Sequence, residues 1–181
     1  MRNSENTRPS RMLALCSMLC ALIIIGAYIR LPFPVPVTLQ LLFTNLGALL
    51  LGRKWSWIPP LLYLCLGLAG LPVFATSSGL GSVLSVSFGF TVGFVPGAAL
   101  SGAIAEKSKS TASLILASTV NVICVYLCGT LYYFGLCNLY LGEAATLSYA
   151  LYVCVVPFIL PDIVKIAISI LLYRKLIKKC A

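Results

Sequence analysis

The chain has 181 residues, of which 60% are apolar and only 9% are charged. This composition excludes an ordinary soluble domain and indicates an integral membrane protein. The formal net charge of +9 does not indicate a nucleic-acid partner, because the basic residues stand singly or in small groups between apolar segments. We therefore interpret them as signals of membrane topology and expect no nucleic acid to bind.

Six apolar segments follow one another along the chain. A helix needs about 20 apolar residues to cross the hydrocarbon core, so a chain of this length with short loops allows about six crossings. We predict an all-α integral membrane protein that forms a single transmembrane domain over residues 1–181. The six transmembrane helices are expected over residues 12–29, 38–52, 55–70, 88–105, 110–136 and 146–173.

The basic residues also predict which side of the membrane each end of the chain occupies. All of the 13 Lys and Arg residues except Arg30 and Lys165 precede the first segment, follow the second or fourth, or end the sixth. The positive-inside rule then puts both termini in the cytoplasm. The first segment follows basic residues, as a signal peptide does, but no small-residue cleavage pattern comes after it, so we expect it to be retained.

Two connections on the expected external side are unusual. The first contains Pro32, Pro34 and Pro36, which forbid a continuous helix and favour extended backbone. The second, over residues 70–81, is uncharged and rich in glycine and hydroxyl groups. Irregular backbone near the bilayer is tolerated where protein or a water-filled cavity covers it. We therefore predict that two external loops cover a ligand pocket.

The fourth segment carries small residues at a strict four-residue spacing: Gly89, Gly93, Gly97 and Ser101. Such a stripe lets another helix approach closely. The neighbouring helix can belong to the same chain or to a partner membrane subunit, and the sequence alone does not separate these alternatives.

Eight cysteines are scattered mostly within the apolar segments, without a Cys-x-x-Cys pair and without any histidine. Metal ligands usually come in closely spaced sets of cysteine and histidine, so we predict no metal site. We expect most of the thiols to act as small buried apolar groups.

The last segment contains an acid and a base, Asp162 and Lys165, three residues apart and therefore on one helical face. Pro157 and Pro161 are expected to break the helix, and a restart at Pro161 would put both charges in its opening turns. Ionisable groups at membrane depth are costly and usually face a cavity, a partner or a substrate. The pair is either a self-neutralised structural pair or part of a polar ligand site.

The sequence argues against catalysis. Its only acids are Glu5, Glu106, Glu143 and Asp162, and it has no histidine, so neither a nucleophile with its base nor a metal cluster can be assembled. There is also no phosphate-binding glycine loop that ends in Gly-Lys-Ser or Gly-Lys-Thr. We expect no enzyme, and any energy from ATP must come from another chain.

What remains is a small set of polar residues under apolar loops, with aromatic side chains as candidate walls. This is the pattern of a small-ligand site. A carboxylate accepts hydrogen bonds from ligand N–H groups, an ammonium group donates to a carbonyl or an anion, and an amide can do either, which suits a cyclic urea or amide. The polar candidates are Asp162, Lys165, Gln40, Thr38, Ser77 and Ser78, and the walls are Phe74, Phe88, Phe90 and Tyr63.

At these residues the chain closely resembles the BioY family, the biotin-binding S components of energy-coupling factor (ECF) transporters. Three blocks carry the resemblance in order: PVPVTLQ at residues 34–40, YLCLGLAGLPVF at residues 63–74, and PFILPDIVK at residues 157–165. Together with the six-helix plan they cover nearly the whole chain.

The resemblance implies uptake of biotin across the bacterial cytoplasmic membrane by a multi-pass protein that has no cofactor. It also implies docking on a transmembrane coupling protein driven by two ATPase subunits, within the lipid bilayer. By position, Asp162, Lys165 and Ser78 would contact the ureido ring of biotin, and the first external loop, which ends at Gln40, would close over the ligand. The substrate-binding residues expected in full are Asp162, Lys165, Ser78, Gln40, Thr38, Phe74, Phe90 and Thr91.

The chain also departs from the family pattern. A Gly-Pro-Thr/Ser-Gly-Gly-Tyr run of the family reads SVSFGF here, at residues 85–90, and Thr91 stands where some members have arginine. Arg30, at the outer membrane face, is an alternative partner for the ligand carboxylate or else an interface anchor. Two other functions stay open: an S component for another vitamin, such as thiamine or riboflavin, and a membrane scaffold in which the Asp162–Lys165 pair is structural.

Overall fold

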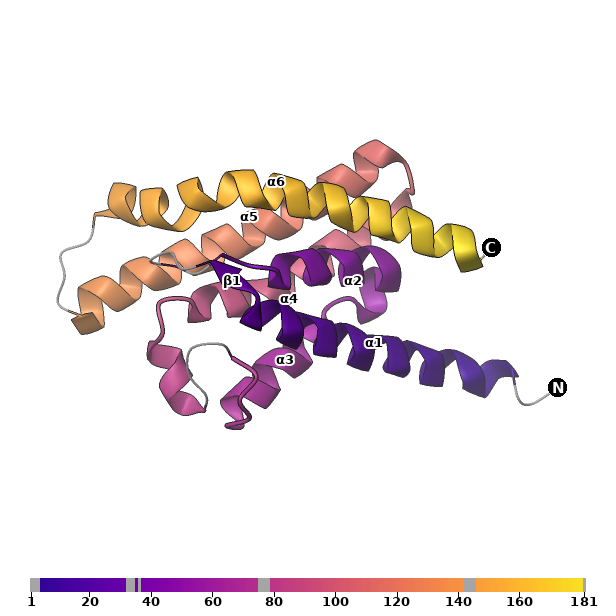
Figure 1. Cartoon of the computed structure of the whole chain (residues 1–181), viewed down its shortest axis with the longest axis horizontal. Coiled ribbons are helices and arrows are strands. Elements are labelled where there is room, and N and C mark those ends of the chain that lie inside the picture. Colours follow the sequence, from indigo (N-terminus) through magenta and orange to yellow (C-terminus); the bar gives the residue numbers. More distant parts are fainter. Residues whose placement is uncertain (1–3, 32–34, 36, 75–78, 142–145, 181) are drawn as a thin grey trace.

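The structure is a computed structural model that describes residues 4–31, 35, 37–74, 79–141 and 146–180. Over these residues the chain forms six α-helices, most of which run along its long axis (Figure 1). They are α1 (Ser4–Tyr28), α2 (Gln40–Trp55), α3 (Ile58–Leu68), α4 (Phe88–Lys107), α5 (Thr111–Leu136) and α6 (Leu147–Cys180).

Four of the described helices are long and apolar enough to cross a membrane: Ser10–Tyr28, Phe88–Lys107, Thr111–Tyr140 and Leu147–Lys178. The other two are shorter, with 16 residues in α2 and 11 in α3. At 1.5 Å per residue, α3 is about 17 Å long, which is less than the hydrocarbon thickness. The prediction of a helical membrane protein is therefore confirmed, whereas the count of six crossings stays a prediction.

Short elements complete the described chain. Strands β1 (Arg30–Leu31) and β2 (Val37–Thr38) pair antiparallel, with Arg30 opposite Thr38. A 3₁₀ helix, η1 (Leu80–Leu84), precedes α4, and a π turn, η2 (Cys137–Leu141), extends α5. The two-residue strands are the one departure from the all-α expectation within the described residues.

The prediction that prolines break the last helix is wrong. Pro157 and Pro161 both lie inside α6, which continues from Leu147 to Cys180. A proline removes one N–H donor and crowds the preceding turn, but in a membrane bundle neighbouring helices and small local adjustments can compensate for it. Because the two prolines are four residues apart, their rings lie on one face of the helix, and the other face keeps its hydrogen bonds.

The small-residue stripe of α4 packs against α5 of the same chain. A Cβ atom on Gly93 would lie 2.9 Å from the Cα atom of Val125, and one on Gly97 would meet the side-chain oxygen of Asn121. Ser101, the last residue of the stripe, is fully buried. The close approach of two helices within the chain, one of the two alternatives for this stripe, is therefore confirmed.

An uncharged polar contact lies inside this packing. The Asn121 Nδ2 group on α5 donates a hydrogen bond of 2.7 Å to Asn45 Oδ1 on α2, and neither residue is exposed. The second polar atom of each amide, Asn45 Nδ2 and Asn121 Oδ1, has no partner among the described residues. We call Asn45 and Asn121 the amide pair. It links α2 to α5 beside Gly97 of α4.

The end of α2 is bent and attached to α4. Gly52 has a φ of +68°, a conformation that glycine adopts without steric cost. After this bend the Arg53 N–H group donates a hydrogen bond of 2.8 Å to the Glu106 carboxylate. Both termini and the link between α4 and α5 lie at this same end of the long axis (Figure 1).

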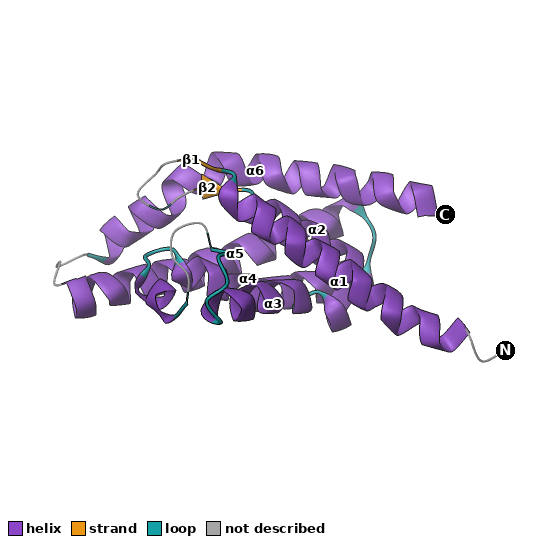
Figure 2. Ribbon diagram, turned by 60° about the horizontal axis from the view of Figure 1, so that its bottom comes forward, coloured by secondary structure: helices purple, strands orange, loops and turns teal. Residues whose placement is uncertain are grey.

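The connections at the other ends of α1 and α3 contact each other. The Tyr28 hydroxyl at the end of α1 donates to the Pro72 carbonyl in the α3–α4 connection. The Leu39 N–H group donates to the Gly26 carbonyl over 3.1 Å, which fixes the start of α2 beside the end of α1. Figure 2 shows β1 and β2 between α1 and α6. These contacts hold the residues that lead into α2 in one place.

The cysteines follow the expectation of burial in part. Cys65 on α3 is exposed, and Cys124 and Cys128 are half-buried. The thiols that are buried as expected, among those described, belong to Cys16, Cys20, Cys137 and Cys154.

Candidate functional site

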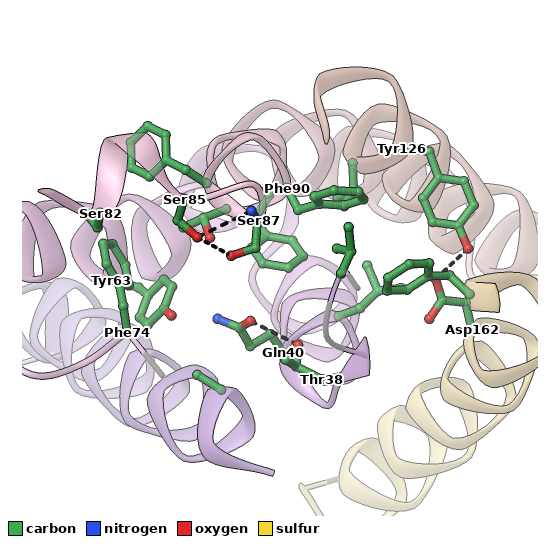
Figure 3. Close-up of a pocket in the computed structure, with 18 of the residues that line it drawn as sticks. Thr38, Gln40, Tyr63, Phe74, Ser82, Ser85, Ser87, Phe90, Tyr126 and Asp162 are labelled. Atoms are coloured by element: carbon green, nitrogen blue, oxygen red, sulfur yellow. Dashed lines mark hydrogen bonds between the residues drawn. The ribbon is translucent and has the colours of Figure 1, made fainter. Parts of the chain in front are cut away.

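A cavity lies where the start of α2, the α3–α4 connection, the start of α4 and the middles of α5 and α6 meet (Figure 3). Its empty volume, counted out to its open mouth, is about 750 Å³. Most of its wall is apolar or aromatic, and the polar groups come from several elements. The polar lining residues are Thr38, Gln40, Tyr63, Ser82, Ser85, Ser87, Thr91, Tyr126, Asp162 and Lys165.

The charged part of the wall comes from α6. Lys165 Nζ lies 2.7 Å from Asp162 Oδ1, as their spacing of three residues on one helix allows. Asp162 is 4% exposed and Lys165 is 5% exposed. A charge at this depth is tolerated only when it is paired and hydrogen-bonded, so the contact neutralises both groups. We call these two residues the charge pair.

A tyrosine of α5 completes the surroundings of the carboxylate. The Tyr126 hydroxyl donates a hydrogen bond of 2.6 Å to Asp162 Oδ2, so each carboxylate oxygen has a partner within the chain. The ring of Tyr126 also lies edge-on to Phe158, with 6.4 Å between ring centres. The carboxylate is therefore held in one orientation from two helices.

On the other side of the cavity, the start of α2 contributes an amide. Thr38 Oγ1 donates a hydrogen bond of 2.9 Å to Gln40 Oε1. Gln40 Nε2 is buried and has no hydrogen-bond partner among the described residues. Figure 3 shows Gln40 between the serines of the α3–α4 connection and the element that carries Thr38, with Asp162 apart from it. The Tyr63 hydroxyl faces this donor, so Gln40 offers a fixed amide next to a second polar group.

The α3–α4 connection contributes hydroxyl groups that pair locally. Ser85 Oγ and Ser87 Oγ are 3.0 Å apart, and Ser82 Oγ donates to the Gly79 carbonyl over 2.6 Å. Serines form such bonds readily in turns, which is why this segment forms a compact 3₁₀ turn before α4. The turn aligns three hydroxyl groups along one wall of the cavity.

Aromatic rings form the apolar walls in two groups. Tyr63 and Phe74 meet edge to face with 5.1 Å between ring centres. Phe90 and Phe158 stack with 5.8 Å between ring centres and 23° between ring planes. Flat apolar walls with a few placed polar groups are typical of small-ligand sites.

The cavity brings together all of the expected site residues that the structure describes. The other expected site residue, Ser78, lies outside the described residues, as does Ser77. The expected residues that line the cavity are Asp162, Lys165, Gln40, Thr38, Phe74, Phe90 and Thr91. Their contact with a ligand stays a prediction.

Sequence reasoning missed Tyr126, Phe158 and Ser82 as lining residues. Tyr126 carried a usable signal, because tyrosine in membrane helices concentrates at the interfaces and this one lies well inside a 26-residue helix. Phe158 is one apolar residue among many and carried none. Arg30, considered for the ligand carboxylate, is exposed on β1 and does not line the cavity.

The site offers a ligand both a hydrogen-bond acceptor and a hydrogen-bond donor. Asp162 accepts hydrogen bonds, Lys165 donates them with up to three N–H bonds, and both face the same cavity. A ligand group that carries N–H donors next to a carbonyl acceptor can replace the contact within the charge pair with one contact to each partner. The apolar walls suit a ligand whose remaining part is hydrocarbon.

The fold and the cavity define a helical membrane protein with a site that suits a small, partly polar ligand. Comparison with known proteins gives the family: the BioY family model matches residues 1–181, and the chain belongs to this family. The "Biotin transporter BioY" of Thermotoga maritima is 34% identical over 170 residues, which cover 93% of this chain and 96% of that protein.

Two further comparisons agree. The "Probable biotin transporter BioY" of Lysinibacillus sphaericus is 32% identical over 169 residues, which cover 92% of this chain and 86% of that protein. Among solved structures, the S-component for biotin from an ECF-type ABC transporter superposes with a TM-score of 0.83 at 26% identity. That match covers 98% of this chain and 95% of the solved chain.

Proposed function

We propose that this chain takes up biotin across the bacterial cytoplasmic membrane as the substrate-binding S component of an ECF-type transporter. The observation that carries the proposal is the cavity wall in which Asp162, Lys165 and Tyr126 meet at membrane depth. The named relatives are biotin transporters, and the solved structure with the same fold is an S-component for biotin. The chain is a transport protein and not an enzyme.

In the proposed complex the bicyclic ring of biotin lies against α6. Its ureido N–H group donates to Asp162, and its carbonyl accepts from Lys165. The stacked rings of Phe90 and Phe158 cover the apolar part of the ligand. Ser78 remains a proposed contact on the same ring, from the segment after α3.

The other end of the ligand carries a carboxylate, and Gln40 is its proposed partner. The Nε2 group of Gln40 is a buried donor that faces the Tyr63 hydroxyl, and it lies apart from Asp162 across the cavity (Figure 3). Thr38 holds the amide by its other atom, so the donor is oriented before the ligand arrives. Thr91 and Phe74 complete the proposed site.

The membrane arrangement is proposed in its finer details. We propose six crossings in a single domain over residues 1–181, with α2 and α3 as the short members and with both termini in the cytoplasm. Four long apolar helices and the gathering of both termini at one end (Figure 1) support this arrangement. The connections above the cavity are then the two external loops.

The proposed partners are a transmembrane coupling protein and two ATPase subunits, since the chain has no phosphate-binding loop of its own. The related solved chain comes from an ECF-type ABC transporter, which supports this assembly. No cofactor is proposed, because the ligand is the cargo.

The proposal is tested by titrating the purified protein with biotin in a calorimeter. Saturable binding at micromolar or lower concentration is expected, and Asp162→Asn should weaken it at least about 100-fold, since it removes a charge-assisted contact to the ligand. Glu106→Gln is the matched control, because this acid lies outside the cavity and binds the backbone of Arg53. Binding of thiamine or riboflavin in place of biotin would reject the proposed ligand.

A scaffold function makes a different prediction for the same variant. If the charge pair served structure alone, Asp162→Asn would reduce the folded fraction on size-exclusion chromatography, and the wild type would not bind biotin. Asp162→Asn lowers the folded fraction under either function, because it leaves the Lys165 ammonium buried without its partner. The transport function therefore requires that the wild type binds biotin and that the folded fraction of Asp162→Asn binds it more weakly.

A further inference from the structure

The end of the molecule that carries both termini also has a groove, which shares no lining residue with the cavity. It lies between the α4–α5 link, the first turns of α5 and the last turns of α6, which come together at this end (Figure 1). The residues that line it are Lys109, Leu114, Leu171, Tyr173, Arg174, Lys175, Ile177 and Lys178.

The groove is strongly basic. Half of its lining residues are lysine or arginine, and within the described part of the chain no acidic residue lines it. Arg174 donates to the Thr111 hydroxyl, and Lys109 Nζ lies 5.9 Å from the centre of the Tyr173 ring. These contacts hold two of the cations at the groove by links between α6 and the start of α5.

Basic residues at the end of a membrane helix commonly serve as topology signals, so charge alone defines no site. The second observation is Tyr173, which is only 3% exposed and lines the groove. Its hydroxyl group is buried and has no hydrogen-bond partner among the described residues. A buried hydroxyl without a partner is unfavourable, which points to an acceptor that comes from outside the chain.

The groove also has an apolar part that a soluble anion would not need. Leu171 is 66% exposed and Ile177 is 43% exposed, and both lie next to the cations along α6. A phospholipid carries both complementary features, a phosphate and hydrocarbon chains. Basic pockets beside membrane helices bind anionic headgroups in this way.

We propose that this groove binds one anionic phospholipid of the cytoplasmic leaflet. Its phosphate oxygens accept hydrogen bonds from Lys109, Arg174 and the Tyr173 hydroxyl, and an acyl chain lies along Leu171. The lipid thereby joins the end of α6 to the α4–α5 link. The site is separate from the ligand cavity and does not depend on the ligand proposed there.

Native mass spectrometry of the full chain in detergent tests this site. Palmitoyl-oleoyl-phosphatidylglycerol is added in one series and the zwitterionic phosphatidylcholine with the same chains in the other. We expect one retained phosphatidylglycerol with at least about tenfold preference, since each cation near an anionic headgroup changes affinity by about fivefold. Equal retention of the two lipids would overturn the proposal.

Three variants localise the effect. Lys109→Gln/Arg174→Gln/Lys178→Gln should lower phosphatidylglycerol retention at least about tenfold. The control Arg53→Gln/Lys54→Gln/Lys107→Gln removes the same charge at the same end of the molecule but outside the groove, and it should retain the lipid. Tyr173→Phe changes one hydroxyl group and should lower retention about fivefold.

An equal loss in the control variant would mean diffuse charge attraction, and it would overturn the proposal. Full retention in Tyr173→Phe would also overturn it, because the cations alone define no site. Displacement of the lipid by millimolar inorganic phosphate would identify a site for a soluble anion. If the triple variant does not fold, Tyr173→Phe and Lys178→Gln alone decide the question.

Discussion

The charge pair and the amide pair are both buried polar contacts within the helices, and they differ in what surrounds them. Asp162 and Lys165 line a cavity that a ligand can enter. Asn45 and Asn121 lie where α2, α4 and α5 pack, and neither residue lines the cavity. One pair can exchange its internal contact for a contact with a ligand, and the other cannot.

Energetics support the same distinction. A buried ion pair is weak evidence for stability, because apolar residues of similar size often stabilise a protein equally well or better. Stability therefore does not explain why a charge pair occupies this helix, whereas ligand recognition does. A hydrogen bond between membrane helices contributes about 0.6 kcal/mol on average, and the amide pair accordingly serves mainly to fix how α2 and α5 align.

The largest expected effect separates ligand recognition from stability at the charge pair. Lys165→Met leaves the Asp162 carboxylate buried without its cation, which should lower the free energy of unfolding by about 3 kcal/mol or more. Biotin binding should fall at least about 100-fold. Thermal unfolding and calorimetric titration measure the two effects.

The double variant Asp162→Asn/Lys165→Met is the decisive companion. It removes both charges, so thermal stability should return to within about 1 kcal/mol of the wild type. Biotin binding should stay lost. Recovery of binding together with stability would contradict the assignment of the charge pair to the ligand.

A smaller effect, on stability alone, is expected where α4 meets α5. Gly93→Ala puts a Cβ atom 2.9 Å from the Val125 backbone, and the helices must move apart, at a cost of about 1–3 kcal/mol. Gly135→Ala on α5 is the control, since its Cβ atom would meet nothing within 4 Å. The midpoint temperature of thermal unfolding should fall only for Gly93→Ala, while the folded fraction keeps its affinity for biotin. A fall in both variants would mean that helix packing at Gly93 is not the cause.

The sequence predicted individual polar and small residues, but it did not predict what they contact. Asp162, Lys165 and Gln40 could be singled out because polar groups are rare in apolar segments, and the stripe that ends at Ser101 because its spacing matches a helical face. The partner of each feature could not be read from the chain. Tyr126 meets Asp162 across 36 residues, and Asn121 meets Asn45 across 76.

The sequence also did not predict that α6 continues unbroken through its two prolines. A proline pattern reports the lost hydrogen bonds of Pro157 and Pro161, but it does not report the neighbouring helices that compensate for them. The same applies to the length of α3, whose apolar segment was expected over residues 55–70 and forms a helix only over Ile58–Leu68. Local patterns predicted where helices exist, whereas packing decided where they end.

The smallest expected effect concerns the tyrosine that orients the charge pair. Tyr126→Phe keeps the ring against Phe158 and removes only the hydrogen bond to Asp162 Oδ2. A hydrogen bond to a charged group contributes about 1.5 kcal/mol or more, so biotin affinity should fall about tenfold if the hydroxyl orients the carboxylate toward the ligand. Tyr152→Phe, which changes an exposed tyrosine on α6, should leave affinity unchanged. If Tyr126→Phe instead binds biotin more tightly, the hydroxyl competes with the ligand for Asp162, and the carboxylate is engaged through the oxygen that Tyr126 now occupies.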